Sequence, residues 1–328
     1  GSAGKTVRYT LPAGGVELRR LIADRCLKRA IPFTGLLPFQ EACALTTGHC
    51  IAIAPTGSGK TEASLLWALH NIAERGGGKL IYLLPTMVTA NSIYHRLEEY
   101  FGRGNVGISH STASLLFEGE EDTPDARDAH FERSFIQPAT VATVDQLLMA
   151  GFNTGRWPLI EANAANGVIV IDEIHAYDPW TLALILQSIE HFAHLGARFM
   201  LMSATMPNYL LDLLESVLPG ARVVRDTSLL DSSRNMFEVV DDEIEVVSDR
   251  IRNAASEGRK TLVVVNSVGK CQDLAKEFSD LNPICYHSRF TLKDRMEKER
   301  TIDEKERADD QGALLIATQV VEVSLDIN

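Results

Sequence analysis

The residues with the clearest chemical potential form a glycine-containing loop at positions 54–61, Ala-Pro-Thr-Gly-Ser-Gly-Lys-Thr. The loop lies between a short apolar run at 51–54 and a stretch of helical periodicity at 61–72. Glycines let successive backbone amides surround a phosphate, and the N-terminus of the following helix adds partial positive charge. The pattern predicts a phosphate-binding loop, although Ala54 replaces the first glycine of the general pattern.

Nucleotide contacts are expected from this loop and from one upstream glutamine. Lys60 is expected to reach the β and γ phosphates, and the Thr61 hydroxyl to bind Mg²⁺. Phe39-Gln40 fits an adenine-reading element: the Gln40 amide could form two hydrogen bonds with the N6 and N7 edge of adenine, and an upstream aromatic could cover the ring. The sequence contains no Asn-Lys-x-Asp guanine motif, so ATP is the expected nucleotide. The candidate cofactor contacts in this region are Gln40, Thr56, Gly57, Ser58, Gly59, Lys60 and Thr61.

Two adjacent carboxylates follow the apolar run at 168–171, in the string Asp172-Glu173-Ile174-His175. A buried strand would place them at the edge where open α/β sheets bind ligands. Asp172 is expected to hold Mg²⁺ through water, and Glu173 to orient and deprotonate the water that attacks the γ-phosphate. Alone, the pair could equally cap a helix. Beside a phosphate loop it favours hydrolysis, with Lys60, Asp172, Glu173 and His175 as the candidate catalytic set.

The triplet Ser203-Ala204-Thr205 follows another apolar run, at 199–202. Parallel strands end at the same sheet edge, so the hydroxyls of Ser203 and Thr205 are expected beside His175. Their expected role is to couple ATP hydrolysis to movement. A phosphate loop, then Asp-Glu-x-His, then Ser-Ala-Thr is the motif order of a helicase.

The elements that must position these residues alternate between strand and helix along the chain. Further buried-strand candidates lie at 80–84, 262–265, 284–286 and 314–317, and helical candidates at 90–100, 179–194 and 292–307. This rhythm predicts an α/β fold with parallel sheets. We expect two RecA-like domains in tandem, at 1–225 and 226–328, joined within the polar stretch around 219–249. The second is expected to be incomplete, because the chain stops just after a strand.

Candidate nucleic-acid contacts are the polar residues that follow the strands. Hydroxyls, amides and loop N–H groups bind phosphodiesters without reading the sequence. Each is individually more typical of an ordinary turn, and only its position after a strand favours a contact. The candidates are Pro85, Thr86, Thr143 and Gln146 in the first domain and Asn266, Ser267, His287, Ser288, Arg289, Thr318 and Gln319 in the second.

Composition limits the class of protein. The chain has 328 residues, and its 45% apolar content argues against disorder. No apolar run approaches the roughly 18–20 residues needed to span a bilayer. Five scattered cysteines without a CxxC pair are typical of a reduced, cytoplasmic protein. The net charge of −12 argues against a polybasic nucleic-acid binder, and the acidic run at 118–128 is expected to be a solvated loop.

Several of these strings, taken together, resemble those of the superfamily 2 helicases of type I CRISPR systems. The resemblance covers most of the chain from about Leu36 to the end. It rests on Pro-Phe-Gln at 38–40, the loop at 55–61, Asp-Glu-Ile-His-Ala-Tyr-Asp at 172–178, Ser-Ala-Thr-Met-Pro at 203–207, His-Ser-Arg-Phe at 287–290, and Thr-Gln-Val-Val-Glu-Val-Ser-Leu-Asp at 318–326.

The resemblance implies an ATP-dependent motor that loads on single-stranded DNA displaced by a crRNA-guided surveillance complex. Such a motor moves 3′ to 5′ and feeds DNA to an HD-type nuclease. Carried over by position, Asp326 would contact the ribose or couple ATP to the strand, and Gln319 and Glu322 would belong to the same interdomain motif. ATP and Mg²⁺ are the implied cofactors.

Two departures from the family pattern change the expectations. The chain contains no His-Asp dipeptide, so nuclease activity is not predicted for it. The final helicase motif, which supplies arginine fingers, is missing because the sequence ends at Asn328. An arginine finger is worth roughly a thousandfold or more in turnover. We therefore expect this chain to bind ATP but to hydrolyse it weakly until that segment is supplied.

Two alternatives remain open on the residues alone. The first is a superfamily 2 RNA helicase, because backbone contacts hardly distinguish the two polymers. The second is a nucleotide-gated binding platform that clamps a strand and recruits a nuclease without unwinding.

Overall fold

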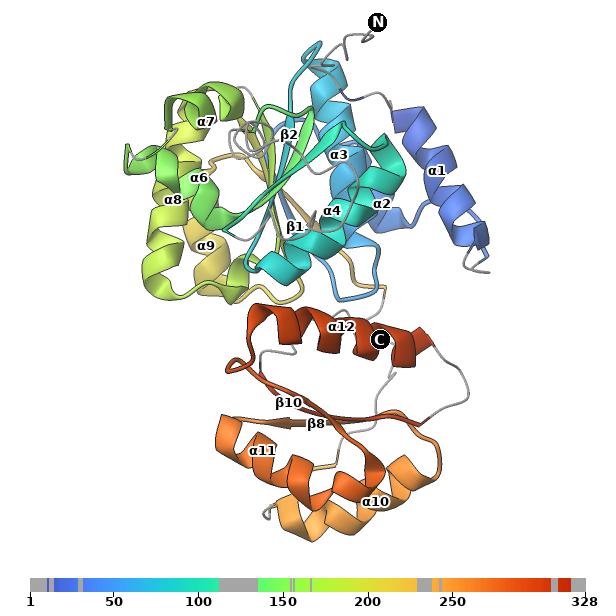
Figure 1. Ribbon diagram of the computed structural model, residues 1–328. Helices are drawn as coiled ribbons and strands as arrows, with labels where there is room; N and C mark the ends of the chain where they lie inside the picture. Colours follow the sequence, from blue (N-terminus) through green and yellow to red (C-terminus); the bar gives the residue numbers. More distant parts are fainter. Residues whose placement is uncertain are drawn as a thin grey trace, which may run out of the picture. The chain divides into compact units, whose positions relative to one another are not determined.

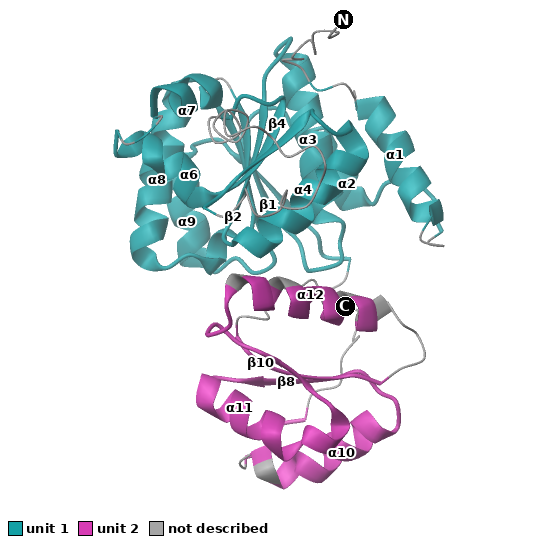
Figure 2. Cartoon of the chain, in the orientation of Figure 1, with its two compact units in different colours: residues 1–233 teal, residues 234–328 magenta. Residues whose placement is uncertain are grey.

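The computed structural model describes residues 11, 15–28, 32–111, 135–153, 155, 157–165, 167–228, 238–241, 244–307 and 312–319. The chain divides into two compact units, Gly1–Ser233 and Arg234–Asn328, which are coloured separately in Figure 2. Each unit is an α/β structure built on its own sheet (Figure 1), which confirms the predicted fold class.

Unit 1 contains a seven-stranded sheet in the order β3-β4-β2-β5-β6-β1-β7. Every neighbouring pair of strands is parallel. The central strands are almost wholly apolar because helices cover both faces of the sheet. In chain order the strands are β1 (Cys50–Ile53), β2 (Leu80–Leu84), β3 (Val106–Ser109), β4 (Ala139–Thr143), β5 (Val168–Ile171), β6 (Arg198–Ser203) and β7 (Arg222–Arg225).

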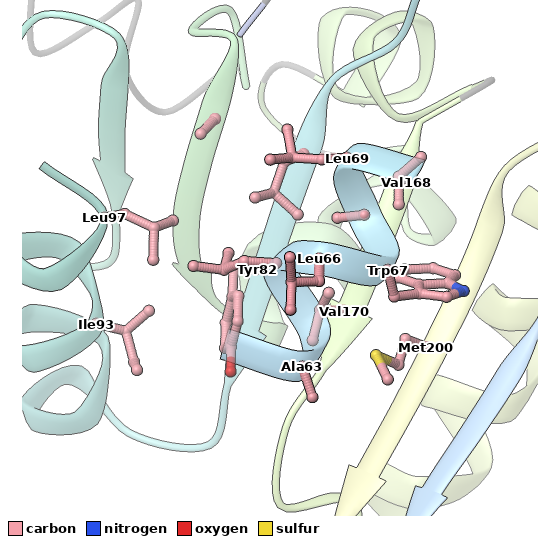
Figure 3. Close-up of a cluster of buried hydrophobic side chains, with 14 of the residues drawn as sticks. Ala63, Leu66, Trp67, Leu69, Tyr82, Ile93, Leu97, Val168, Val170 and Met200 are labelled. Atoms are coloured by element: carbon pink, nitrogen blue, oxygen red, sulfur yellow. The ribbon is translucent and has the colours of Figure 1, made fainter. Parts of the chain in front are cut away.

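The helices of unit 1 cover the two faces of this sheet (Figure 1). One face packs against α1 (Gly15–Lys28), α2 (Pro38–Ala44), α3 (Lys60–Glu74) and α4 (Met87–Phe101). The other face packs against α6 (Val144–Gly151), α7 (Trp157–Ala164), α8 (Pro179–His194) and α9 (Asn208–Val217). Trp67 and Tyr82 are among the largest fully buried side chains of the first face (Figure 3).

The register of the central strands brings the chemically interesting loops to one edge. Ile53 of β1 is paired with Ser203 of β6, and Ile171 of β5 is paired with Leu201 of β6. Because β6 lies between β5 and β1, the Ser-Ala-Thr segment lies between the phosphate loop and the Asp-Glu-Ile-His segment. The fold thus gathers the three motifs at the carboxyl ends of adjacent strands.

Unit 2 is built on a three-stranded parallel sheet in the order β8-β10-β9. Its strands are β8 (Thr261–Val265), β9 (Ile284–Tyr286) and β10 (Leu314–Thr318), and its α-helices are α10 (Ser248–Ser256), α11 (Val268–Glu277) and α12 (Leu292–Arg307). Val263, Leu274 and Phe278 form part of a core between the sheet and α11, and Tyr286 and Ile302 pack on the other face.

The structure differs from the sequence analysis in the polar stretch around 219–249. Arg222–Arg225 forms β7, which pairs with β1 as the edge strand of unit 1. Only Val224 of this strand is buried, and Arg222 and Arg225 at its ends are exposed. A strand at the edge of a sheet needs fewer apolar residues than a central strand. The acidic run at 118–128 lies outside the described residues.

No helix among the described residues is long and apolar enough to cross a membrane. The cysteines are all free thiols.

Candidate functional site

The phosphate loop has the backbone geometry that its glycines predict. Gly57 and Gly59 adopt left-handed φ angles of 82° and 75°, a region that favours glycine. Thr56 and Gly57 are exposed, whereas Ser58 is buried and its Oγ has no hydrogen-bond partner in the described part of the chain. The loop therefore presents an open tip above the N-terminus of α3.

Lys60 joins this loop to the end of β5. Its Nζ lies 2.9 Å from Glu173 Oε1, and the Lys60 side chain is only 10% exposed. Glu173 itself has a left-handed φ of 48°, which costs a non-glycine residue of order 1–3 kcal/mol. Such strain is typical of functional positions, and here it directs the carboxylate toward the phosphate loop.

Asp172 is held from two sides. Its Oδ2 accepts a hydrogen bond from the Tyr82 hydroxyl at 2.9 Å, and its Oδ1 accepts one from the Glu173 backbone N–H at 2.9 Å. Burial, helped by the nearby Glu173 charge, raises the pKa of Asp172 to about 6. Burial also raises the pKa of Tyr82 well above its ordinary value, so its phenol remains a hydrogen-bond donor.

His175 connects the second and third motifs. Its Nδ1 lies 2.7 Å from Ser203 Oγ and 3.3 Å from Glu173 Oε2. Ser203 Oγ also accepts the Thr205 backbone N–H at 3.2 Å, and it contacts the Thr205 carbonyl. Glu173 Oε2 is buried without a hydrogen bond among the described residues. A carboxylate oxygen in that condition is suited to accept a proton from a water molecule.

A group of residues that the sequence analysis missed lies beside Thr61. Arg96 of α4 donates from Nη1 to Thr61 Oγ1 at 3.3 Å and from Nε to Glu62 Oε1 at 3.1 Å. Tyr100 donates to the same Glu62 oxygen at 2.8 Å. Burial acts to lower the pKa of Arg96, but the charge and hydrogen bonds of Glu62 outweigh it and raise that pKa. No local motif indicates this cluster, since its members come from two helices.

Gln40 is engaged by the protein on both ends of its amide. Its Oε1 accepts the Leu37 backbone N–H at 3.0 Å, and its Nε2 donates to the Gly59 carbonyl at 3.3 Å. Phe39 is 4% exposed and packs in the core, so it does not offer a face to adenine. Gln40 thus braces the phosphate loop, and a side chain on Gly59 would bring Cβ to 2.3 Å from its Nε2.

The residues at this edge fit Mg²⁺ and a nucleoside triphosphate. A hydroxyl from Thr61 and a carboxylate from Asp172 are hard oxygen donors, and Mg²⁺ keeps several waters and substrate phosphates as its other ligands. The described residues contain no cluster of three or more His, Cys, Asp or Glu side chains that could hold a metal, so a dedicated protein cage is not present there. The glycine loop supplies the amides for the phosphates.

The candidate nucleic-acid contacts of unit 1 differ in availability. Pro85 and Thr86 are partly exposed at the start of α4, where Thr86 Oγ1 caps the helix by accepting the Thr89 N–H at 3.3 Å. Thr143 and Gln146 are buried, and the Gln146 amide bonds to Ser109 and Asp145. The segment at Pro85 and Thr86 is therefore the more accessible of the two.

In unit 2 the candidates follow all three strands and so share the carboxyl edge of the small sheet. Asn266 and Ser267 follow β8 and are exposed, and Thr318, which ends β10, is buried beside exposed Gln319. After β9, Ser288 and Arg289 are exposed. His287 is buried in this loop and stacks on Phe290 at 4.2 Å between ring centroids. The other two candidates, Glu322 and Asp326, lie outside the described residues.

Two protein-family models match different parts of this chain. Residues 38–213, more than half of the chain, match the family model of DEAD/DEAH box helicases. This chain belongs to that helicase family. Residues 257–328 match the model for the C-terminal part of the CRISPR-associated nuclease/helicase Cas3, so the helicase region is Cas3-like.

Individual relatives agree with this assignment. The helicase region is 33% identical over 300 residues to a putative CRISPR-associated nuclease/helicase Cas3 of Methanocaldococcus jannaschii, covering 84% of this chain and 40% of the relative. A crystal structure of T. fusca Cas3 with ADP has a TM-score of 0.71 at 24% identity, covering 98% of this chain and 43% of that one. A chain in a CRISPR RNA-guided surveillance complex, pre-nicking, has a TM-score of 0.58 at 23% identity, with coverages of 97% and 39%. The chain thus spans less than half the length of these relatives.

Proposed function

We propose that this chain is the ATP-driven motor of a helicase–nuclease that moves along single-stranded DNA in type I CRISPR interference. The observation that carries the proposal is the 2.9 Å contact between Lys60 and Glu173, which joins the phosphate loop to the Asp-Glu-Ile-His segment. Membership of the helicase family and the Cas3-like match of residues 257–328 support the CRISPR context.

Each residue of the site has a distinct task in this proposal. The loop amides and Lys60 hold the phosphates of ATP, and Thr61 and Asp172 hold Mg²⁺, which neutralises charge on the phosphates when it is bound. Glu173 takes a proton from the attacking water through Oε2, the oxygen that lies 3.3 Å from His175 Nδ1. His175 and Ser203 link Glu173 to the Ser-Ala-Thr segment, so they are suited to transmit hydrolysis to the rest of the motor. Asp326 and Glu322 are proposed to serve the same coupling from unit 2.

The proposed track contacts are the exposed or partly exposed residues that follow the strands. In unit 1 these are Pro85 and Thr86, and in unit 2 they are Asn266, Ser267, Ser288, Arg289 and Gln319. Contacts of this kind grip the phosphodiester backbone and carry no sequence information, which suits a motor that must pass over any sequence. The buried candidates His287, Thr143, Gln146 and Thr318 are proposed to support these loops from below.

The partners proposed for the motor are an HD-type nuclease, either fused or separate, and a crRNA-guided surveillance complex that exposes the strand. A related chain occurs in a structure of such a complex, and curated relatives are named as nuclease/helicases. This chain spans 40% of the M. jannaschii relative. Activity with these partners is therefore to be measured on the full-length source protein.

The deciding experiment compares ATP turnover of the full-length protein without polymer, with single-stranded DNA and with single-stranded RNA of the same sequence. The proposal predicts that DNA stimulates turnover severalfold more than RNA. Equal or greater stimulation by RNA would instead support an RNA helicase.

A binding platform that only recruits a nuclease is tested separately, with Lys60→Ala. A motor needs ATP hydrolysis to supply DNA to its nuclease, so processive DNA degradation should stop in this variant. A platform should continue to support cleavage by its partner.

A further inference from the structure

Both side chains that are proposed to hold Mg²⁺ receive a hydrogen bond from one continuous segment, β2–α4. Tyr82 of β2 donates to Asp172 Oδ2 at 2.9 Å, and Arg96 of α4 donates to Thr61 Oγ1 at 3.3 Å. Figure 3 shows Tyr82 between α3 residues such as Leu66 and α4 residues such as Ile93 and Leu97. Packing on both sides fixes the ring, so its hydroxyl has a defined direction.

The hydrogen bond from Tyr82 constrains the carboxylate that it touches. Asp172 Oδ1 is already bonded to the Glu173 N–H, so the two bonds together fix the rotation of the carboxylate plane. Each oxygen retains a lone pair that can accept from a metal-bound water. Without the Tyr82 hydroxyl, the Asp172 carboxylate could rotate about its Cβ–Cγ bond. Metal binding would then have to restrict that rotation, at a cost in entropy.

Arg96 raises a question of charge, because a guanidinium beside a metal ligand repels a dication. The Glu62 carboxylate neutralises this charge. It is 7% exposed, pairs with Arg96 through two guanidinium nitrogens and also accepts a hydrogen bond from Tyr100 at 2.8 Å. The pair leaves Arg96 able to orient the Thr61 hydroxyl while its charge is neutralised. The arrangement resembles the partners that orient ligands in established metal sites.

We propose that Tyr82 and Arg96 are positioning residues for the metal that accompanies the nucleotide, Tyr82 acting on Asp172 and Arg96 acting on Thr61, with Glu62 neutralising Arg96. This assignment rests on the proposed function, since it requires a magnesium nucleotide at the site. It also means that the segment carrying the track candidates Pro85 and Thr86, between β2 and α4, holds both metal ligands.

The test measures the affinity of the chain for a fluorescent, non-hydrolysable ATP analogue at increasing Mg²⁺ concentration. Loss of a residue that orients a metal ligand typically costs 10–100-fold in metal affinity. Tyr82→Phe and Glu62→Gln are therefore expected to raise the Mg²⁺ concentration for half-maximal effect about tenfold. Affinity in the presence of EDTA should stay at the wild-type value, because the phosphate loop is untouched.

A double variant separates charge from packing. Glu62→Gln leaves the Arg96 cation unpaired, so adding Arg96→Met should recover part of the lost Mg²⁺ affinity. If Glu62 served only as packing, the double variant would bind Mg²⁺ no better than Glu62→Gln alone.

The matched control is Tyr94→Phe, which removes a buried phenol on α4 that donates to Glu98 at 3.0 Å. Its Mg²⁺ dependence should equal that of the wild type, and thermal melting checks that every variant folds. Wild-type Mg²⁺ dependence in both Tyr82→Phe and Glu62→Gln, or an equal shift in Tyr94→Phe, would overturn the assignment. A wild-type chain that binds no nucleotide with or without Mg²⁺ would contradict the proposed function itself and with it this assignment.

Discussion

Glu173, the proposed catalytic base, combines three properties that are individually ordinary. Its backbone is left-handed, its Oε1 is paired with Lys60, and its Oε2 is buried with no hydrogen bond from the described residues. The left-handed backbone sets the direction of the side chain, and Lys60 holds one carboxylate oxygen beside the phosphate loop. The remaining oxygen, which lies 3.3 Å from His175 Nδ1, is the one proposed to accept a proton from water.

Replacing this proposed base should separate binding from hydrolysis. Glu173→Gln is expected to lower ATP turnover by about a hundredfold or more, since general bases contribute roughly 10²–10⁴-fold. The affinity for ATP should change little, because the loop amides and Lys60 remain. Steady-state turnover and equilibrium nucleotide binding measure the two effects, and Glu161→Gln on α7 serves as the control. A proportional loss of binding would argue that Glu173 is structural.

Ser203 tests coupling rather than chemistry. Ser203→Ala removes the hydroxyl that faces His175 Nδ1 and accepts the Thr205 N–H, while leaving Glu173 and Lys60 in place. Coupling free energies typically correspond to 5–150-fold, so strand unwinding should fall about tenfold or more relative to ATP turnover. The ratio of base pairs opened to ATP consumed is the quantity to measure. An unchanged ratio would remove Ser203 from the coupling set.

The motif residues could be predicted from sequence because each motif is local and its spacing encodes the turn that displays it. Tyr82 and Arg96 could not, since they reach Asp172 and Thr61 across 90 and 35 positions. Gln40 was named from the sequence as a residue of the nucleotide site. Its hydrogen bond to the Gly59 carbonyl could not be predicted, because it depends on how α2 packs on the phosphate loop.

At the scale of elements, the long apolar strands and strongly periodic helices were predictable. The strands Leu80–Leu84 and Val168–Ile171 and the helix Pro179–His194 have the predicted bounds. The strand Arg222–Arg225 was missed because an edge position demands little burial. Helix α1 was missed as well, and only Leu18 and Ile22 of that helix are buried.

The start of β2 depends on a partly buried lysine. Lys79 Nζ donates to the carbonyls of Phe135 and Ile136 and to Asn163 Oδ1, at 3.1, 2.7 and 2.6 Å. Lys79→Met removes the donor of these three hydrogen bonds and should lower the free energy of unfolding of unit 1 by about 1–3 kcal/mol. Urea unfolding measures this, with exposed Lys28→Met as the control.

The difference in free energy of unfolding between the wild type and Lys79→Met should depend on pH, and the sign of that dependence follows from the pKa of Lys79. Burial lowers the pKa of Lys79 to about 8 from 10.5. Between these two values the unfolded chain keeps a proton that the folded chain has lost, so the wild type gains stability as the pH rises. The destabilisation by Lys79→Met should therefore grow from pH 8 to about pH 10. If the difference in free energy of unfolding shrinks over this range, the oxygens bonded to Lys79 keep its amine protonated in the folded chain.

At the scale of the whole molecule, charge bears on how the proposed motor would hold DNA. Residues 1–225 contain 18 basic and 22 acidic side chains, and residues 226–328 contain 14 and 22. Neither part is basic, so we expect contacts with the strand to rely mainly on hydroxyls, amides and main-chain groups, with Arg289 as a cationic candidate. Such contacts release few counterions.

Binding of single-stranded DNA should accordingly depend weakly on salt. Each neutralised phosphate of a single strand contributes about −0.7 to the slope of log affinity against log salt concentration, and we expect the equivalent of about two to four phosphates. Fluorescence anisotropy from low to moderate salt measures the slope. A slope corresponding to eight or more phosphates would indicate a cationic groove and contradict this account.

The central claim is that hydrolysis at the Lys60–Glu173 site drives movement along single-stranded DNA. The most direct measurement is displacement of streptavidin from the biotinylated end of a DNA strand by the full-length source protein. The account predicts displacement with ATP, and none with a non-hydrolysable analogue or in Lys60→Ala. Displacement that proceeds equally without hydrolysis, or in Lys60→Ala, would contradict it.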